Sequence, residues 1–279
     1  LTQRRTQNIK EFCITPAKEV IFDAAALAEK INAEGLGLYK DIPYTVGTAG
    51  TTPDGLDDIA NASYALDMQK VPAGMRCAVW NPLATSKLKQ VPAIVNAEKC
   101  GSTSALRTGA IGKVFGIENY MSQAVKTHES SSTGDTFAVK SAATDSDTLA
   151  LTITGSGTIK KGDIITVAGK NHVATADATK SGTTVTVKVY PNVTAVTTDT
   201  VTVLGDHAAN LVFHPDAFAF ITRPLQAPAG VESYVTTYNG ISLRVVRGYD
   251  MKYKREMLSM DVLYAFKTIY PELAVRYLG

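Results

Sequence analysis

The sequence predicts an α+β fold into which a separate all-β domain is inserted. Two observations carry this prediction. Helix-like and strand-like segments follow one another up to residue 127 and again after residue 207, whereas the composition changes abruptly from His128 to His207. That middle stretch is dense in threonine, lacks arginine, tryptophan, cysteine and methionine, and has Phe137 and Tyr190 as its only large aromatic residues.

The first element predicted is a helix from Thr15 to Gly35. Thr15-Pro16 is a capping residue followed by a proline at the first helical position, and Gly35 is a stop signal. Between them, apolar residues recur at helical spacing on one stripe, namely Val20, Ala24, Leu27 and Ile31.

A glycine- and threonine-rich loop, Tyr44 to Gly55, precedes a second predicted helix. We expect Asp57 to cap this helix, with Ile59, Ala62 and Leu66 on its inner face. The apolar run Met75 to Trp80 then predicts a buried strand. Asn81-Pro82 repeats the cap-plus-proline signal and predicts a third helix through about Val95.

Within the middle stretch, apolar and hydroxyl side chains alternate with the period of two that is typical of half-buried strands. Glycine, serine, lysine and asparagine between the alternating segments indicate turns. The pattern therefore predicts a small antiparallel barrel or sandwich. Four strands are expected, at 148–154, 163–168, 183–189 and 200–204.

Mixed character returns after the insert. The strand-like Asn210 to Phe213 is followed by His214-Pro215, which predicts a second strand-to-helix unit ending near Arg223. The remaining expectations are a strand, a charged hinge, a strongly apolar strand, and a final edge strand or turn, at 240–248, 250–258, 261–270 and 271–277 respectively.

Composition excludes several classes of protein. Twenty-eight basic and 26 acidic residues give a net charge of +2, too balanced for a nucleic-acid-binding domain with a clustered basic face. No apolar window is long enough to span a bilayer, and no signal segment begins the chain. Cys13, Cys77 and Cys100 are odd in number and far apart, which favours neither disulfides nor zinc.

Catalytic and ligand-binding motifs are incomplete. The fragment at 155–157 is interpreted as a hairpin turn rather than a nucleophile elbow. The stretch at 47–51 lacks the lysine of a phosphate loop, and the one at 109–114 has valine where a hydroxyl is needed. His128-Glu129 and Asp145-Ser146-Asp147 do not complete a zinc or calcium motif. We therefore expect no catalytic, cofactor-binding or metal-binding residues, and no enzyme.

Two groups of basic residues are expected on ordinary solvated faces or in ion pairs between subunits, with contact to DNA phosphates as the alternative. They are Arg4-Arg5 near the start and Lys252, Lys254 and Arg255 near the end.

The segment Gly109 to His128 resembles the corresponding stretch of the P22-type tailed-bacteriophage coat proteins. Other features resemble that family in kind and order, from about Thr15 onward. They are the loop Val46 to Pro53, the strand-to-helix unit Arg76 to Ala84, the threonine-rich insertion, and the strand Gly240 to Val246.

The resemblance implies an HK97-like capsid fold with peripheral and axial domains and a long spine helix. Its expected domains are an N-terminal segment and spine helix (1–43), two axial parts (44–127 and 208–247), the inserted β domain (128–207) and a peripheral return (248–279). It also implies that an N-terminal arm and most of an extended loop precede Leu1, so a processed or trimmed start is expected.

The function implied is that of a major capsid protein, assembled in the bacterial host cytoplasm into an icosahedral head that encloses double-stranded DNA. Expected partners are further copies in hexamers and pentamers, scaffolding and portal proteins, and non-specifically bound DNA, with no membrane. Two alternatives stay open: a phage tail or head-connector protein, and an extracellular β-rich binding module. The second would want exposed aromatic residues in the insert.

Overall fold

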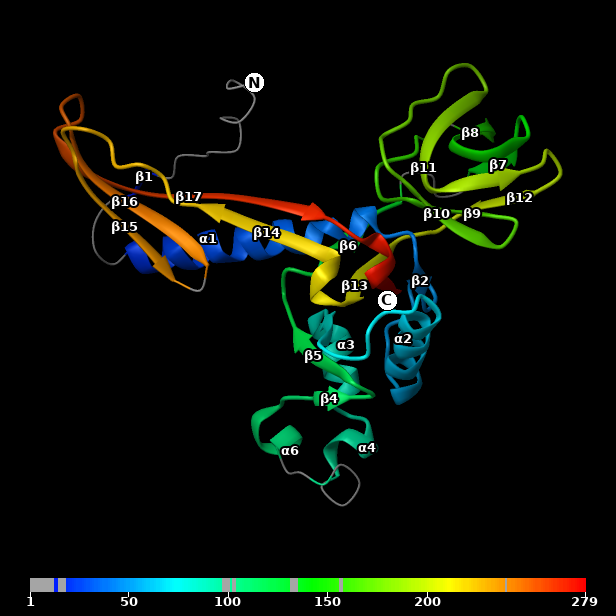
Figure 1. Ribbon diagram of the computed structural model, residues 1–279, viewed down its shortest axis with the longest axis horizontal. Helices are drawn as coiled ribbons and strands as arrows, with labels where there is room; N and C mark the ends of the chain where they lie inside the picture. Colours follow the sequence, from blue (N-terminus) through cyan, green and yellow to red (C-terminus); the bar gives the residue numbers. More distant parts are fainter. Residues whose placement is uncertain are drawn as a thin grey trace. The chain divides into compact units, whose positions relative to one another are not determined.

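The computed structural model describes residues 13–14, 19–96, 101, 104–130, 135–155, 158–238 and 240–279 (Figure 1). The chain forms two compact units. Unit 1 combines residues 1–35 with 219–267, and unit 2 combines residues 36–218 with 268–279. Each unit is described by itself.

Unit 1 contains one long helix and an antiparallel sheet. The helix is α1 (Glu19–Leu36), which confirms the predicted helix; its expected Thr15-Pro16 cap lies outside the described residues. The sheet order is β1-β17-β16-β15, and β14 also pairs with β17. The strands are β1 (Cys13–Ile14), β14 (Phe218–Arg223), β15 (Glu232–Tyr238), β16 (Ile241–Asp250) and β17 (Arg255–Thr268).

The charged segment after β16 is a tight turn, so the predicted hinge at 250–258 is wrong. Asp250 pairs directly with Arg255, which makes β16 and β17 one long hairpin. Two local features close the turn: the Asp250 carboxylate accepts the backbone N–H of Lys252 at 2.8 Å, and Lys254 adopts a left-handed φ of 52°.

Unit 2 is built on a seven-stranded sheet of order β2-β18-β13-β3-β5-β4, with β6 also paired to β13. The pairs β18–β2 and β3–β5 are parallel, and the other pairs in this sheet are antiparallel. Its strands are β2 (Thr45–Val46), β3 (Arg76–Trp80), β4 (Gly112–Val114), β5 (Ile117–Met121), β6 (Thr127–His128), β13 (His207–Phe213) and β18 (Ala274–Leu278).

Helix α2 (Leu56–Met68) packs on this sheet through the face that the sequence predicts, since Ile59, Ala62 and Leu66 are fully buried. Its start differs from the prediction. Gly55 is the N-cap, and the Asp58 carboxylate reaches back to accept the N–H groups of Asp54 and Gly55. Asp57 lies within the first turn, where its charge favours the helix dipole.

The shorter helical segments are η1 (Gly37–Asp41), α3 (Pro82–Leu88), α4 (Pro92–Val95), α6 (Ser104–Thr108), η2 (Pro215–Ala217) and η3 (Pro271–Leu273). Asn81 caps α3 as predicted, with its side chain accepting the N–H of Ala84 at 2.7 Å. The expected single helix through Val95 is instead two, because Pro92 lacks an N–H and excludes Val91 from helical backbone.

Two expectations near the end of the chain are wrong. The second strand-to-helix unit is a single 3-10 turn followed by β14, which pairs with β17, and Phe220 of β14 stacks on Phe266 of β17 with ring centroids 4.7 Å apart. The last segment is an inner strand rather than an edge strand: β18 lies between β2 and β13 and is buried along its whole length.

The threonine-rich stretch forms a closed barrel of order β10-β11-β8-β7-β12-β9. The four predicted strands are present, and β7 and β10 were missed. The strands are β7 (Thr136–Val139), β8 (Ala143–Thr154), β9 (Ile164–Val167), β10 (Lys170–Ala174), β11 (Thr184–Ala195) and β12 (Thr200–Val203). Inward-facing aliphatic residues fill the interior, including Leu149, Leu151, Ile165, Val185 and Val187.

The boundaries around the barrel follow strand pairing. His128 of β6 pairs with His207 of β13, so the two ends of the threonine-rich stretch lie side by side. Elsewhere the units divide differently from the expected domains. Residues 219–247 join α1 because β14 and β16 pair with β17, and residues 268–279 join unit 2 because β18 lies within its sheet.

Candidate functional site

Five polar side chains from separate elements of unit 2 gather where the barrel meets the seven-stranded sheet. Each is less than 5% exposed. Three belong to strands of the sheet, one to η1, and one to the turn that leads into the barrel strand β9. We call them the junction cluster: Tyr39, His128, Asp163, His207 and Arg276.

Asp163 is the acidic centre of the junction cluster. Its carboxylate accepts the N–H of Lys160 at 2.8 Å and Nε2–H of His128 at 2.7 Å. Nδ1 of His128 lies 3.1 Å from the Tyr39 hydroxyl, which both donates and accepts and so bonds to either form of the ring. A hydrogen-bonded chain therefore runs from the barrel through His128 to η1.

Arg276 supplies the positive charge. Its Nη1 donates to the carbonyl of Gly162 at 2.8 Å, and its guanidinium lies 4.6 Å from the centre of the Tyr39 ring. Burial lowers the pKa of Arg276 to about 10, against the opposing influence of Tyr39 and Asp163, so the group stays protonated at neutral pH. Burial likewise raises the pKa of Tyr39.

His207 completes the cluster as an uncharged member. Burial and the neighbouring Arg276 lower its pKa to about 4, which leaves the ring neutral at pH 7. Its ring centroid lies 5.3 Å from that of His128, and Nδ1 donates to the carbonyl of Gly205 at 2.7 Å.

Contacts outside the cluster reinforce the same junction. Lys161 forms an ion pair with Asp41 at 2.8 Å, and the Asn171 amide donates to the Thr45 hydroxyl at 2.6 Å. The Tyr190 hydroxyl donates to Glu272. These three contacts join the barrel to η1, to β2 and to η3 (Pro271–Leu273). The junction cluster and these contacts attach the barrel to the rest of unit 2.

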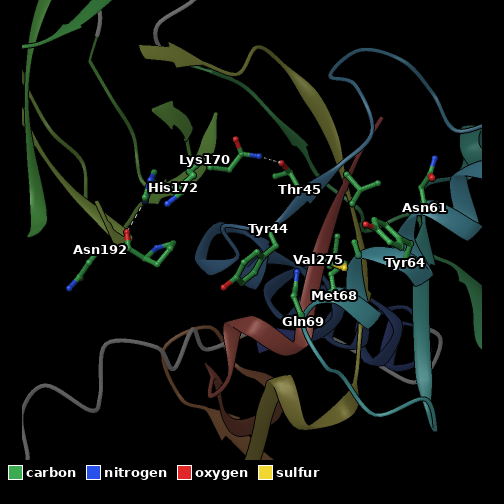
Figure 2. Close-up of a pocket in the computed structure, with 14 residues that line it drawn as sticks. Tyr44, Thr45, Asn61, Tyr64, Met68, Gln69, Lys170, His172, Asn192 and Val275 are labelled. Atoms are coloured by element: carbon green, nitrogen blue, oxygen red, sulfur yellow. Dashed lines mark hydrogen bonds between the residues drawn. The ribbon is translucent and has the colours of Figure 1, made fainter. Parts of the chain in front are cut away.

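An open groove of about 850 Å³ lies beside the junction (Figure 2). Asn61, Tyr64 and Met68 of α2 form one wall, and barrel residues including Lys170, His172 and Asn192 form the other. His172 is tied back by a 2.8 Å hydrogen bond between Nδ1 and the carbonyl of Pro191. Burial lowers the pKa of His172, so the groove presents a neutral imidazole at neutral pH.

Among the described side chains of unit 1, more large apolar residues are exposed than buried. Among its described side chains only Ile31 and Met260 are buried large apolar residues. Eight are exposed instead: Phe220, Ile221, Val231, Tyr234, Tyr238, Tyr249, Met251 and Tyr253. The described hydrophobic clusters all lie in unit 2. A sheet with this distribution presents a surface suited to a protein partner.

The fold is similar to that of a solved structure. A structure titled "Mycobacterium phage Che8" matches with a TM-score of 0.53 at 14% identity, over 97% of this chain and 70% of that one. The fold is that of a bacteriophage protein. Two other matches are titled "Capsid structure of the Cyanophage P-SCSP1u" and "Asymmetric unit of bacteriophage PhiM1 mature capsid". Their TM-scores are 0.45 and 0.47, at 14% and 9% identity, each over 97% of this chain and 71% and 70% of the other.

No protein-family model and no curated protein matches the sequence. Within the described parts of this phage fold, no three histidine, cysteine or acidic residues group as metal ligands do. None of the described helices has both the length and the hydrophobicity needed to cross a membrane.

The motifs weighed in the sequence take ordinary places in the phage fold. Residues 47–51 form a loop. Residues 109–111 lead into strand β4, which consists of Gly112 to Val114. Asp145, which was weighed as part of a calcium motif, lies within β8 at a left-handed φ of 47°, where the Asn192 amide donates to its carboxylate at 3.1 Å. Residues 156–157 lie outside the residues that the structure describes.

The basic and cysteine residues also have simple surroundings where they are described. Lys252 and Arg255 flank the ring of Tyr253 at 5.2 and 5.3 Å, as solvated cations at a hairpin turn. Cys77 is free and partly buried. Arg4-Arg5, Cys100 and the side chain of Cys13 lie outside the described part.

The sequence patterns did not predict the junction cluster. His128 was considered only with its neighbour Glu129, and the other four members carried no signal. The signal that identifies this cluster is the joint burial of a histidine, an aspartate and an arginine. Local periodicity in the sequence does not predict that such polar residues are buried.

Proposed function

We propose that this protein is the major capsid protein of a tailed bacteriophage, and that its copies assemble into an icosahedral head around double-stranded DNA. In this proposal the phage fold is the P22-type, HK97-like shell fold, with α1 as the spine helix and the barrel as the inserted domain. Hexamers and pentamers are the building units, and scaffolding and portal proteins assist assembly. The protein then acts as a building block and not as an enzyme.

The observation that carries the proposal is the exposed sheet of unit 1. Met251 is 86% exposed and Tyr253 is 62% exposed at the tip of the β16–β17 hairpin, and groups of exposed apolar side chains mark protein-interaction sites. Burying an apolar side chain of this size contributes about 1.5–3 kcal/mol. Two such residues give about 3–6 kcal/mol, of the same order as the cost of immobilising a subunit.

A single contact of this strength is weak, whereas a closed shell repeats it many times. Symmetric closure turns modest contacts into a stable container, because each subunit is held by several neighbours at once. This reasoning favours a shell subunit over a monomeric binding module. In the barrel, Tyr190 bonds to Glu272 and is not free to stack on a sugar, which counts against the extracellular binding alternative.

The test is to express the full chain alone and with candidate scaffolding proteins and to image the product by negative-stain electron microscopy. We expect shells or ring-shaped capsomers. Met251→Asp should leave thermal unfolding unchanged and abolish these particles. Val196→Asp is the matched control, since Val196 is exposed on a barrel loop. A wild-type chain that stays monomeric in sedimentation at high concentration, with or without scaffolding proteins, would contradict the proposal.

A further inference from the structure

Strand β15 is the outer strand on one side of the unit 1 sheet. It follows β16 as the last strand in the order, and no described strand pairs with its outer side. It is seven residues long, and Glu232 at its start is its single charged residue. Tyr234 and Tyr238 are 69% and 78% exposed.

This edge lacks the usual protection against pairing with another strand. Natural edge strands are kept short, or carry a lysine, a proline or a bulge. The seven-stranded sheet of unit 2 follows that rule, because its edges are β2 and β4 with two and three residues. Strand β15 is longer, has no lysine or proline, keeps an unbroken register with β16, and carries one charged side chain, Glu232, only at its start.

The hairpin geometry shows which backbone groups face outward. Tyr238 pairs with Ile241 across a two-residue loop, and such a closing pair is a hydrogen-bonded pair. Bonded and non-bonded pairs alternate along an antiparallel ladder. Tyr234, Thr236 and Tyr238 therefore bond to β16, whereas Ser233, Val235 and Thr237 direct their N–H and C=O groups to the free edge.

From this edge we infer that β15 pairs antiparallel with β15 of a second copy of the chain, across a two-fold axis at Val235. The inference rests on the proposed self-assembly and names one of its contacts. Val235 faces Val235 of the second copy, and Ser233 faces Thr237. The outward groups then form three bonded pairs, with about six N–H···O bonds.

Charge and side-chain pairing support this register. The antiparallel pairing places Glu232 opposite Tyr238 of the second copy, so the two carboxylates lie at opposite ends of the ladder. A parallel pairing in register would set one Glu232 beside the other, which is destabilising. In the antiparallel register Tyr234 also faces Thr236, a pair of aromatic and β-branched side chains that stabilises sheets.

Cysteine cross-linking tests the register directly. In a chain whose three native cysteines are replaced by serine, Val235→Cys brings two Cα atoms to about 5.5 Å in a bonded pair, within disulfide range. We expect most of the assembled protein to run as a disulfide-linked dimer on a non-reducing gel. Thr237→Cys is the matched control, because its two Cα atoms would lie about 14 Å apart.

Mixing supplies a second readout. Thr237→Cys mixed with Ser233→Cys should restore cross-linking, because these positions face each other. Val235→Glu and Val235→Lys should each lower the assembled fraction at least tenfold when alone, and a mixture of the two should recover it. This charge-swap pair does not depend on the cysteine-free background.

The outcomes separate this inference from the proposed function. Shells that form normally while Val235→Cys cross-links no more than Thr237→Cys would overturn the β15 pairing and leave the capsid function standing. Cross-linked dimers that never form shells would support the pairing and count against the capsid function. A wild-type chain that stays monomeric would overturn both.

Discussion

Replacing Asp163 with alanine removes the negative centre of the junction cluster, and the structure allows the loss to be estimated. Two hydrogen bonds disappear, from the Lys160 N–H and from His128, and both donors stay buried or partly buried. Each unpaired donor costs about 1–3 kcal/mol. Arg276 also loses the nearby opposite charge that favours its protonated form. Leaving a buried charge without a nearby opposite charge costs about 3–5 kcal/mol, so we expect a loss of that size.

Thermal unfolding measures this loss. For a unit of this size about 1 kcal/mol corresponds to roughly 2–4 °C, so the midpoint should fall by roughly 6–20 °C. Asp177→Ala is the matched control: its carboxylate accepts the backbone N–H of Lys161 at 2.7 Å, but the residue is exposed. We expect the control to lose about 1 kcal/mol.

A second substitution checks the cause. If the loss comes from an uncompensated buried cation, adding Arg276→Met to Asp163→Ala should recover part of it, because an apolar side chain of similar length needs no charge partner. A midpoint for Asp163→Ala within 2 °C of the wild type, or a double variant less stable than the sum of the single losses, would refute this reasoning.

Three further outcomes are expected. Because the pKa of His207 falls from 6.5 to about 4 on folding, its contribution to stability is complete above pH 6.5 and is lost as the pH falls toward 4. It amounts to about 3 kcal/mol, and His207→Gln should flatten this part of a denaturant-midpoint-against-pH curve. Asn81→Ala removes the cap of α3 and should cost about 1 kcal/mol in urea unfolding, whereas an unchanged midpoint would mean that the cap is dispensable. Deleting residues 129–206 with a short linker should leave a remainder that unfolds cooperatively, because His128 and His207 are paired. Adding Arg276→Met to this deletion variant should raise its thermal unfolding midpoint. Loss of cooperative unfolding would place the barrel within the main core.

Local periodicity was enough to predict the helices and strands in which buried residues recur at a regular spacing along the chain. Ile59, Ala62 and Leu66 repeat at helical spacing and are fully buried in α2, and the threonine alternation gives the barrel strands. The Asn81-Pro82 signal also starts a helix, since a capping bond joins residues only three positions apart.

The same reasoning failed where a distant strand decides the outcome. His214-Pro215 begins a helical turn, but the residues that follow form β14, which pairs with β17 in a sheet. Residues 271–277 were expected to form an edge strand or a turn, yet β18 (Ala274–Leu278) lies between two strands and is fully buried. Sheet order is a matter of pairing between remote segments, and no local period encodes it.

The sequence by itself determined the α+β class, the inserted β-rich stretch, and most of the strands and helices, because backbone preferences and burial period act over a few residues. The tertiary structure decided the closed barrel, the junction cluster and the open edge at β15. Each depends on which segments become neighbours. Tyr39, Asp163 and Arg276 meet only because η1, the barrel and β18 converge, and burial then makes their charges matter.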